Sequence, residues 1–351
     1  MVYRGVSLFS GAGGMDIGFR NAGVDVVWAN DFNADACSTY AQNLGGAIHC
    51  GDIMALIPEL ADYRGAELVF GGPPCQGFSV AGKMDPTDSR SQLIWRFADV
   101  VEVVRPCGFV MENVKALAAL SRWGRVRMSL VARLRSLGYD CRIVVLNASD
   151  FGVPQNRERM FMFGIRSDVG RLHGIEQLLC GFHESAPTVG DVVRSLGRAG
   201  SAHNPGVCRA RVTLADNPVL RRSPYAGMLF NGQGRPLRSA GISSTLPATM
   251  GGNRTPIVDD REIFDGDESW VEAYHRYLMD GGSPKEYPGG VPPWLRRLTV
   301  QEARQLQTFP DTYVFSGTQS SVYRQIGNAV PCRLAEAVGS VAVALLAANS
   351  K

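Results

Sequence analysis

The chain has 351 residues, of which 45% are hydrophobic and 20% are charged, a balance typical of a globular protein with a sizeable core and two domains. No stretch approaches 18 uninterrupted apolar residues and the N-terminus leads straight into a strand pattern, so we expect no membrane span and no secretory leader. The net charge of +3 is too small to establish a polyanionic partner. Eight cysteines occur without a Cys-x-x-Cys pair and apart from the five histidines, which indicates reduced thiols and no metal site.

The first 165 residues alternate short β-branched runs with longer helical patterns. Strands are predicted at 4–9, 24–30, 68–70, 108–112, 142–147 and 160–165. Helices are predicted at 14–22, 34–44, 89–105 and 125–137. This alternation indicates βαβ units, and we therefore expect an α/β fold with a parallel sheet and helices on both faces.

The composition and the secondary-structure pattern of the chain change after about residue 184. As far as about residue 293 the chain is rich in Gly, Pro, Ser and Asn, with one convincing helix at 268–279, which is typical of loops on a small irregular domain. Helical patterns return at 299–308, where Thr299 and Glu302 form a capping-box pair, and at 332–348. We predict domains at 1–184 and 185–310, and a segment, 311–351, that returns to the first domain.

Arginine is concentrated in the irregular segment. Only four of the 36 basic residues in the chain are lysine. Between residues 194 and 254 there is one acid, Asp216, and nine arginines, for a local net charge of +8: 194, 198, 209, 211, 221, 222, 235, 238 and 254. The planar guanidinium group suits phosphates and guanine edges. A GC-rich genome would explain the general excess of arginine, but it does not explain the lack of acids here.

A glycine-rich turn, Gly11-Ala12-Gly13-Gly14, follows the first predicted strand and opens a helix, which gathers backbone N–H groups at the helix N-terminus. A dinucleotide fingerprint would require glycine at position 16, where the chain has Asp16, and this argues against a dehydrogenase. Asp31 follows the second strand, where an acid can accept hydrogen bonds from ribose hydroxyls.

Cys75 lies in the run Gly71-Gly72-Pro73-Pro74-Cys75-Gln76-Gly77-Phe78-Ser79, directly after a predicted strand. Each proline ring holds φ near about −65°, and the glycines allow close approach of another molecule. A thiol on such a rigid turn at a strand end is well placed to attack a ligand.

Five blocks in this chain resemble, in the same order, the motifs of DNA (cytosine-5)-methyltransferases of the prokaryotic restriction–modification type. They are Ser7-Leu8-Phe9-Ser10-Gly11-Ala12-Gly13-Gly14, the cysteine loop, Glu112-Asn113-Val114, Gln155-Asn156-Arg157-Glu158-Arg159 and Arg324-Gln325-Ile326-Gly327-Asn328-Ala329-Val330-Pro331. They extend from residue 7 to residue 331, which is nearly the whole chain. The resemblance implies a Rossmann-like methyltransferase sheet with a small target-recognition domain.

The resemblance also implies S-adenosylmethionine as the methyl donor, with S-adenosylhomocysteine as the product. The glycine turn suits the amino-acid end of this cofactor, Asp31 the ribose and Asp52 the adenine amino group. The residues expected at the cofactor are Phe9, Gly11, Gly13, Gly14, Asp31, Phe32, Asp52, Ile53, Pro74, Leu93 and Asn328.

The implied chemistry is addition of the Cys75 thiolate to C6 of cytosine, which makes C5 nucleophilic. Glu112 would protonate or hydrogen-bond N3, while Arg157 and Arg159, which alternate along a strand, would hold the base and brace the loop. The cytosine has to be flipped out of the duplex, and the segment 79–91 is interpreted as a lid over it. The sequence does not identify the base that removes the C5 proton. The residues expected to contact DNA are Gln76, Ser79, Lys83, Arg221, Arg222, Arg235, Arg238 and Arg254.

Two alternatives stay open from the sequence. One branch of the family is similar to the DNA enzymes but methylates tRNA cytosine; the other alternative is a DNA-binding paralogue without catalytic activity. The arginine-rich segment and Gly77-Phe78-Ser79 favour duplex DNA, and the intact catalytic positions favour an enzyme. The absence of N-terminal regulatory modules indicates a stand-alone prokaryotic or phage enzyme. We expect it to act in the cytoplasm at the nucleoid, as a monomer on DNA, alongside a cognate restriction endonuclease.

Overall fold

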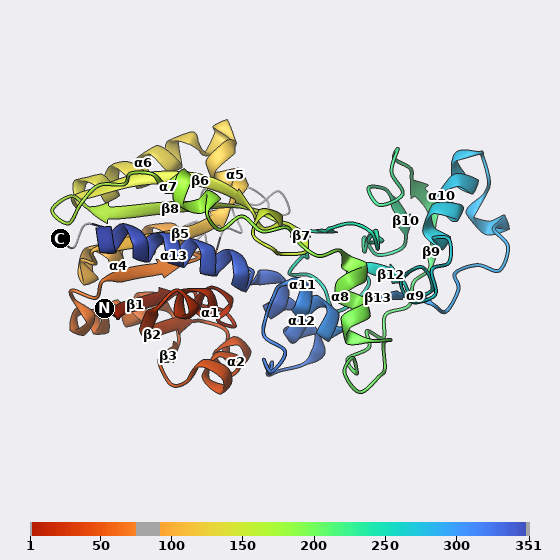
Figure 1. The fold of residues 1–351 in the computed structure, drawn as a ribbon, viewed down its shortest axis with the longest axis horizontal. Helices are drawn as coiled ribbons and strands as arrows, with labels where there is room; N and C mark the ends of the chain where they lie inside the picture. The colour runs from red at the N-terminus through yellow and green to blue at the C-terminus, as the bar shows by residue number, and fades with distance from the viewer. Residues whose placement is uncertain (1, 75–91, 349–351) are drawn as a thin grey trace. The chain divides into compact units, whose positions relative to one another are not determined.

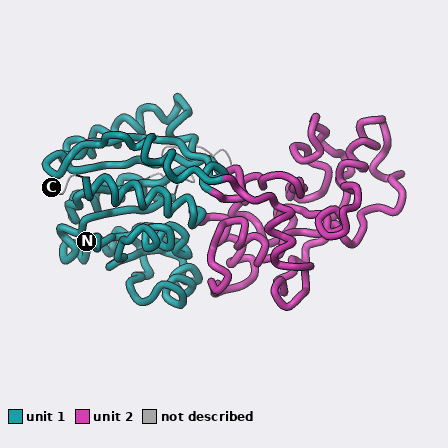
Figure 2. Tube along the Cα trace, viewed as in Figure 1, with its two compact units in different colours: residues 1–151, 157–184, 330–351 teal, residues 152–156, 185–329 magenta. Residues whose placement is uncertain are grey.

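The computed structural model describes residues 2–74 and 92–348. The chain forms two compact units (Figure 2). Unit 1 comprises residues 1–151, 157–184 and 330–351, and unit 2 comprises residues 152–156 and 185–329. Besides the short stretch 152–156, the chain enters unit 2 at Ser185 and returns to unit 1 at Val330.

Unit 1 is built on a seven-stranded sheet with the order β3-β2-β1-β4-β5-β8-β6 (Figure 1). Its strands are β1 (Tyr3–Leu8), β2 (Val24–Asp31), β3 (Ile48–Cys50), β4 (Leu68–Gly71), β5 (Gly108–Val114), β6 (Tyr139–Asn147) and β8 (Glu158–Arg166). The predicted α/β class is confirmed, but the sheet is not wholly parallel. β8 is antiparallel to both β5 and β6. The connection from β6 to β8 is too short for a crossover helix, so the chain can only turn back.

Helices cover both faces of this sheet. They are α1 (Gly14–Asn21), α2 (Ala34–Leu44), α3 (Ile53–Leu56), α4 (Leu93–Val104), α5 (Lys115–Ala119), α6 (Gly124–Ser136), α7 (Ile175–Cys180) and α13 (Cys332–Ala348). Alternate residues of β4 face opposite layers, as the pleat of a strand requires. Val69 joins the core cluster that contains Phe97 of α4, whereas Phe70 stacks on Phe19 of α1, with ring centroids 4.1 Å apart.

The C-terminal helix α13 packs closely against α1 because Gly18 lies at their contact. A Cβ atom at Gly18 would lie 2.3 Å from the backbone nitrogen of Glu336. The Asn21 side chain also donates a hydrogen bond to Glu336, at 3.0 Å. The end of the chain thereby supports the helix that follows the glycine-rich turn.

Unit 2 contains short two-stranded sheets and several helices. Its strands are β7 (Gln155–Asn156), β9 (Leu214–Val219), β10 (Met228–Phe230), β11 (Ser243–Ser244), β12 (Ile257–Asp259) and β13 (Leu295–Arg297). Its helices are α8 (Val189–Leu196), α9 (Asp260–Phe264), α10 (Trp270–Met279), α11 (Val300–Leu306) and α12 (Gln319–Asn328). The sequence interpretation missed α8, although Thr188 and Asp191 form a complete capping box at its start.

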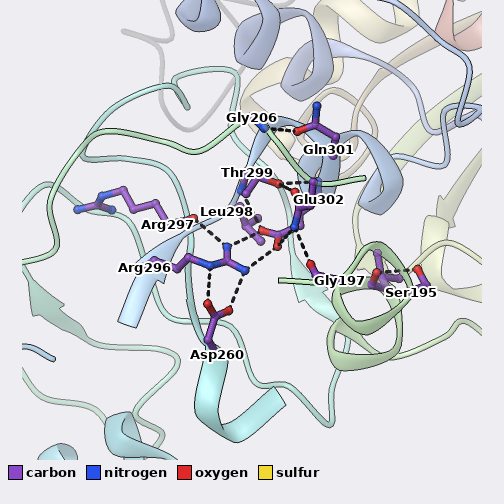
Figure 3. Close-up of polar contacts among 12 residues, drawn as sticks. Ser195, Gly197, Gly206, Asp260, Arg296, Arg297, Leu298, Thr299, Gln301 and Glu302 are labelled. Carbon is purple, nitrogen blue, oxygen red and sulfur yellow. Dashed lines mark hydrogen bonds and ion pairs between the residues drawn. The ribbon is translucent and has the colours of Figure 1, made fainter. Parts of the chain in front are cut away.

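A buried polar cluster holds unit 2 together (Figure 3). Arg296 forms ion pairs with Asp260 at 2.8 Å and with Glu302 at 2.7 Å. Glu302 also accepts hydrogen bonds from the backbone of Thr299 and from the side chain of Asn204. These contacts connect β13, α9, α11 and the segment after α8. One guanidinium thus faces two carboxylates; burial raises the pKa of Asp260, and Arg296 partly offsets that shift.

The stretch Gln319–Ala348, which comprises α12 and α13, is long and apolar enough to cross a membrane by length and composition. Within the structure 67% of its apolar window is buried. This burial is typical of helices that pack in a protein core.

Candidate active site

The candidate site lies at the carboxyl edge of the sheet, where the strand order reverses between β1 and β4. Ligands of open α/β sheets bind in the crevice at such a reversal. Leu8, the last residue of β1, pairs with Asn30 of β2 on one side and with Gly71 of β4 on the other. Gly71 in turn pairs with Met111 of β5. The next residue on each strand, namely Asp31, Phe9, Gly72 and Glu112, therefore lies in a row along this edge.

The glycine-rich turn is attached to Asp31. The Asp31 carboxylate accepts one hydrogen bond from the backbone N–H of Gly11 and another from that of Asn33, each at 2.8 Å. Gly13, with φ of 78°, caps α1 in the left-handed region that glycine tolerates. Burial raises the pKa of Asp31, although these N–H donors oppose the shift. Each carboxylate oxygen keeps a lone pair for a further donor, such as a ribose hydroxyl.

The surroundings of this turn suit an organic ligand with an aromatic part. The Phe32 side chain is 79% exposed, which is unusual for a large apolar residue beside a buried carboxylate. Nothing lies within 4 Å of the position that a Cβ atom of Gly11 would occupy, so the turn borders open space. Phe9, with φ of 54°, has a strained backbone at the same edge, a feature that is common at binding sites. These residues fit an adenosine-type cofactor.

The other residues expected at the cofactor differ in their burial and in the elements to which they belong. Asp52 is exposed and caps α3, accepting a hydrogen bond from the N–H of Met54 at 3.0 Å. Ile53 is buried in the core, and Leu93 at the start of α4 is partly buried against it. Pro74 is partly buried, whereas Asn328 is exposed at the end of α12 and belongs to unit 2. Gly14 is the first residue of α1.

Glu112 lies in β5, forms an ion pair with Arg159 and is also influenced by the charge of Arg157. Its side chain is only 13% exposed, and its Oε1 atom lies 3.1 Å from Nε of Arg159. Burial raises the pKa of Glu112, while the positive charges of Arg159 and Arg157 partly offset the shift. Arg157 is 3% exposed and lies between β7 and β8, where Asn147 accepts a hydrogen bond from its backbone N–H. The structure thus brings together Glu112, Arg157 and Arg159.

Two contacts connect Glu112 to the start of the cysteine loop. A Cβ atom at Gly72 would lie 2.8 Å from Oε2 of Glu112, so the backbone after β4 passes close to the acid and a larger residue there would displace its carboxyl group. The buried Asn113 side chain donates a hydrogen bond to the carbonyl of Pro73 at 3.1 Å. Sequence reasoning missed the role of Asn113, although Asn113 is part of the Glu-Asn-Val block.

Cys75, Gln76, Ser79 and Lys83, and with them the segment 79–91 interpreted as a lid, lie outside the described residues. Pro74, the residue directly before Cys75, is the last described residue of this part of the chain. Within residues 2–74 and 92–348, no group of His, Cys, Asp and Glu side chains could hold a metal ion.

The arginines of the irregular segment fall into two groups. Arg194 and Arg198 form ion pairs with Asp191 and Asp265, so they serve the structure of unit 2. The other seven are exposed, and no ion pair joins them to an acid among the described residues: 209, 211, 221, 222, 235, 238 and 254. All five arginines expected at DNA belong to this second group.

Comparison with known proteins identifies the family. The profile of the C-5 cytosine-specific DNA methylases matches residues 3–343. The chain belongs to this family. The Type II methyltransferase M1.HphI of Haemophilus parahaemolyticus is 32% identical over 95% of this chain and 84% of its own length. The Type II methyltransferase M.MthTI of Methanothermobacter thermautotrophicus is 31% identical over 94% of both chains. The chain is therefore a DNA methyltransferase of the restriction–modification type.

Solved structures share the fold. A DNA modification methyltransferase encoded within a prophage of E. coli has a TM-score of 0.68 at 21% identity, over 98% of this chain and 99% of its own. The Dnmt2 methyltransferase of S. pombe has a TM-score of 0.68 at 19% identity, over 99% of this chain and all (100%) of its own. The mixed α/β architecture with a central sheet is thus that of C-5 methyltransferases.

Proposed function

We propose that this enzyme transfers a methyl group from S-adenosylmethionine to C5 of a flipped-out cytosine within one short duplex DNA sequence, through a covalent bond between Cys75 and C6. The observation that carries the proposal is the way Glu112 is held. The acid is buried beside Arg159 and lies close to Gly72, while the next residue, Asn113, donates a hydrogen bond to Pro73 in the backbone that leads into Cys75. An acid and a thiol that act on one pyrimidine ring need such a connection.

S-adenosylmethionine would supply an electrophilic methyl group when bound. Asp31 would accept hydrogen bonds from the ribose, and the N–H of Gly14 at the start of α1 would face the amino-acid end. Gly11 and Gly13, whose N–H groups bind Asp31 and Ser10, would let the cofactor approach the turn closely. The exposed ring of Phe32 and the ring of Phe9 would cover the adenine. Asp52, Ile53, Pro74, Leu93 and Asn328 complete the proposed set. Among these residues, Asp52 already uses its exposed carboxylate to cap α3.

The reaction would begin with attack of the Cys75 thiolate on C6, which forms the S–C6 bond and places negative charge on the ring. Glu112 would stabilise this charge by donating a proton to N3, for which its raised pKa suits it. Arg157 and Arg159 would hold the Glu112 carboxyl group and the cytosine. Once C5 carries the methyl group, a base removes the C5 proton, the S–C6 bond breaks to release the Cys75 thiolate, and the proton on N3 returns to Glu112.

DNA would be bound by the cysteine loop and by unit 2. Gln76, Ser79 and Lys83 follow the nucleophile directly and would contact the DNA near the flipped base, with 79–91 as a lid. Arg235, Arg238 and Arg254 would read guanine edges, and Arg221 and Arg222 would contact phosphates. All five side chains are exposed, as this role requires. Residues 1–184 would then serve as the catalytic domain and 185–310 as the target-recognition domain.

In the cell, we propose that the enzyme acts in the cytoplasm at the nucleoid, as a monomer on duplex DNA, and protects the sites of a cognate restriction endonuclease. The tRNA alternative predicts methyl transfer to tRNA rather than to duplex DNA. The alternative of a silent paralogue predicts cofactor binding without transfer to any DNA.

A covalent trap tests the mechanism. Duplexes that carry 5-fluorocytosine should form an adduct with the unaltered protein and S-adenosylmethionine that survives a denaturing gel, because fluorine at C5 blocks the final elimination. Cys75→Ala should form no adduct but should still bind the cofactor, whereas the control Cys180→Ala, which alters an exposed thiol at the end of α7, should behave like the unaltered protein. Methyl transfer by Cys75→Ala would refute the covalent mechanism.

A further inference from the structure

Arg297 is a buried arginine at the centre of unit 2. Only 1% of its surface is exposed to solvent, and its side chain is among the largest that are fully buried in the described residues. Its neighbour Arg296 points elsewhere, toward Asp260 and Glu302, since successive residues of a strand face opposite sides (Figure 3). Arg296 belongs to the acidic cluster described above. Arg297 forms no ion pair with an acid among the described residues.

The Arg297 guanidinium instead donates hydrogen bonds to three backbone carbonyls. The acceptors are Thr255 at 2.7 Å, and Arg211 and Asn231 at 3.4 Å each. These carbonyls belong to three separate loop segments, 209–213, 231–235 and 253–256. A buried cation without an acid is costly, and these carbonyls satisfy part of the guanidinium, whose Nε atom is buried without a partner. The three segments are therefore held at one point by a single side chain.

The surrounding backbone is shaped to admit this guanidinium. A Cβ atom at Gly234 would lie 2.3 Å from NH1 of Arg297 and 2.3 Å from the carbonyl of Thr255. The N–H of Gly234 also donates to the carbonyl of Asn253 at 3.0 Å, and the N–H of Asn231 donates to that of Thr213 at 2.9 Å. Only glycine at 234 leaves room for both the loop contact and the arginine.

Each of the three segments carries an exposed arginine at, or within four residues of, a carbonyl that Arg297 binds. Arg211 supplies one of the carbonyls itself, Arg254 precedes Thr255, and Arg235 follows Gly234. The three exposed guanidinium groups therefore project from backbone that a single buried side chain fixes. Discrimination between base edges requires such fixed spacing, because a bidentate contact to guanine depends on geometry.

We propose that Arg297 is a positioning residue that sets the spacing of Arg211, Arg235 and Arg254 for sequence discrimination on DNA. This inference rests on the proposed role of the arginine segment in reading DNA. Arg297 touches neither the base nor the cofactor; it acts through the three loops. Lysine cannot replace it, because an ammonium group lacks the planar fork that reaches several carbonyls.

Bisulfite sequencing first identifies the cognate sequence. The test then compares the methylation of a duplex with that sequence with the methylation of duplexes altered at one base pair. Arg297→Lys should lower the ratio of kcat/KM between cognate and altered duplexes by at least about fivefold, the low end for one lost base contact. Its affinity for S-adenosylmethionine should stay unchanged. The matched control Arg222→Ala, at a proposed phosphate contact, should weaken all duplexes alike and leave the ratio intact. An unchanged ratio in a folded Arg297→Lys protein would overturn the proposal.

A second measurement tests whether Arg297 holds the loops without using DNA, and it uses two variants, so that it does not depend on the folding of either one alone. Hydrogen exchange of Arg297→Lys and of Gly234→Ala, in the full-length protein without DNA, should be faster in 231–235 and 253–256 than in the unaltered protein, with α8 unchanged. Unchanged exchange in those segments would also overturn it. Arg235→Ala and Arg254→Ala separate the two hypotheses. If both weaken every duplex equally, the proposed reading role fails, whereas the exchange result still decides whether Arg297 holds the loops.

Discussion

Two opposing influences act on the Glu112 carboxyl group. Burial favours the protonated form, and the guanidinium groups of Arg159 and Arg157 favour the ionised form. The result is a carboxyl group whose pKa is raised but whose charge can still be accommodated. Such a group can hold a proton for the ring and release it again, which is the requirement for acid–base catalysis near neutral pH.

Glu112→Gln should therefore lower turnover much more than DNA binding. A neutral amide can still hydrogen-bond to the base but cannot deliver a proton to N3, and the expected loss in kcat is about 10²–10⁴-fold, the usual size of an acid–base contribution. Single-turnover rates and duplex affinity, measured on the same preparations, separate the two effects. Equal losses in both would show that Glu112 only holds the flipped base.

The two candidate cofactor acids, Asp31 and Asp52, differ in their surroundings. Asp31 is tied to the glycine turn by backbone donors, so Asp31→Ala should weaken S-adenosylmethionine binding by about 1–3 kcal/mol, the cost of leaving polar partners unpaired. Asp52→Ala is expected to weaken binding by about 1–3 kcal/mol as well if its carboxylate contacts the adenine amino group. Calorimetric titration distinguishes the roles. Unchanged affinity in Asp52→Ala would mean that this residue only caps α3.

Asp16 predicts a pH dependence of stability. Its side chain is fully buried, and burial raises its pKa to about 6. Hydrogen bonds, including one from the Tyr40 hydroxyl at 2.9 Å, partly oppose this shift. Because the folded state binds this proton more tightly than the unfolded state, its stabilising contribution is present below about pH 4 and is lost as the pH rises through about 6. The loss amounts to about 3 kcal/mol for two pKa units.

Asp16→Asn removes this titration. The free energy of unfolding of the variant, relative to the unaltered protein, should therefore increase by about 3 kcal/mol between pH 4 and pH 7. Urea unfolding at several pH values measures it. A difference between the two proteins that does not change with pH would contradict the buried, proton-binding carboxyl group.

At the level of elements, the end of β5 positions the loop after β4. Asn113→Ala should lower kcat because the Pro73 carbonyl loses its buried donor, with a local cost of about 1–3 kcal/mol, while the KM for the cofactor should stay constant. Lys115→Ala is the matched control, since its ion pair with Glu158 is about half exposed and contributes at most about 1 kcal/mol. Equal effects of both substitutions on kcat would argue against a specific role for Asn113.

Element patterns in the sequence predicted most of unit 1, because its strands and helices are long and strongly periodic. The reversed direction of β8 could not be read from periodicity, which is the same for parallel and antiparallel strands; only the short connection after β6 indicates it. The capping box at Thr188 was a readable signal for α8, whereas the placement of Arg297 was not. A buried arginine bound to carbonyls of distant segments has no local pattern, since its partners lie far away in the sequence.

The sequence motifs located several residues of the candidate site but not the contacts between them. The motifs predicted Asp31 and Glu112 near strand ends, and the structure has Asp31 as the last residue of β2 and Glu112 within β5. Arg157 and Arg159 were expected on one strand, but Arg157 lies between β7 and β8. The hydrogen bond from Asn113 to Pro73 depends on pairing between β4 and β5, which a single sequence does not reveal.

For the whole molecule, the exposed arginines should divide into two classes on DNA. Alanine at Arg235, Arg238 or Arg254 should relax preference at single base pairs, by about 1–3 kcal/mol each. Alanine at Arg221 or Arg222 should weaken all duplexes alike and reduce the salt dependence of binding by about one unit per lost contact. Equilibrium binding at several salt concentrations, on cognate and altered duplexes, makes the comparison. Uniform behaviour of all five would mean that another part of the chain reads the sequence.

The central claim is that this chain alone methylates C5 of cytosine at one short DNA sequence through Cys75. Bisulfite sequencing of plasmid DNA from cells that express the protein tests it most directly, because 5-methylcytosine resists conversion. We predict unconverted cytosine at a single position of one recurring sequence with the unaltered protein, and full conversion with Cys75→Ala. Full conversion with a folded, unaltered protein, or protection that persists with Cys75→Ala, would contradict the account.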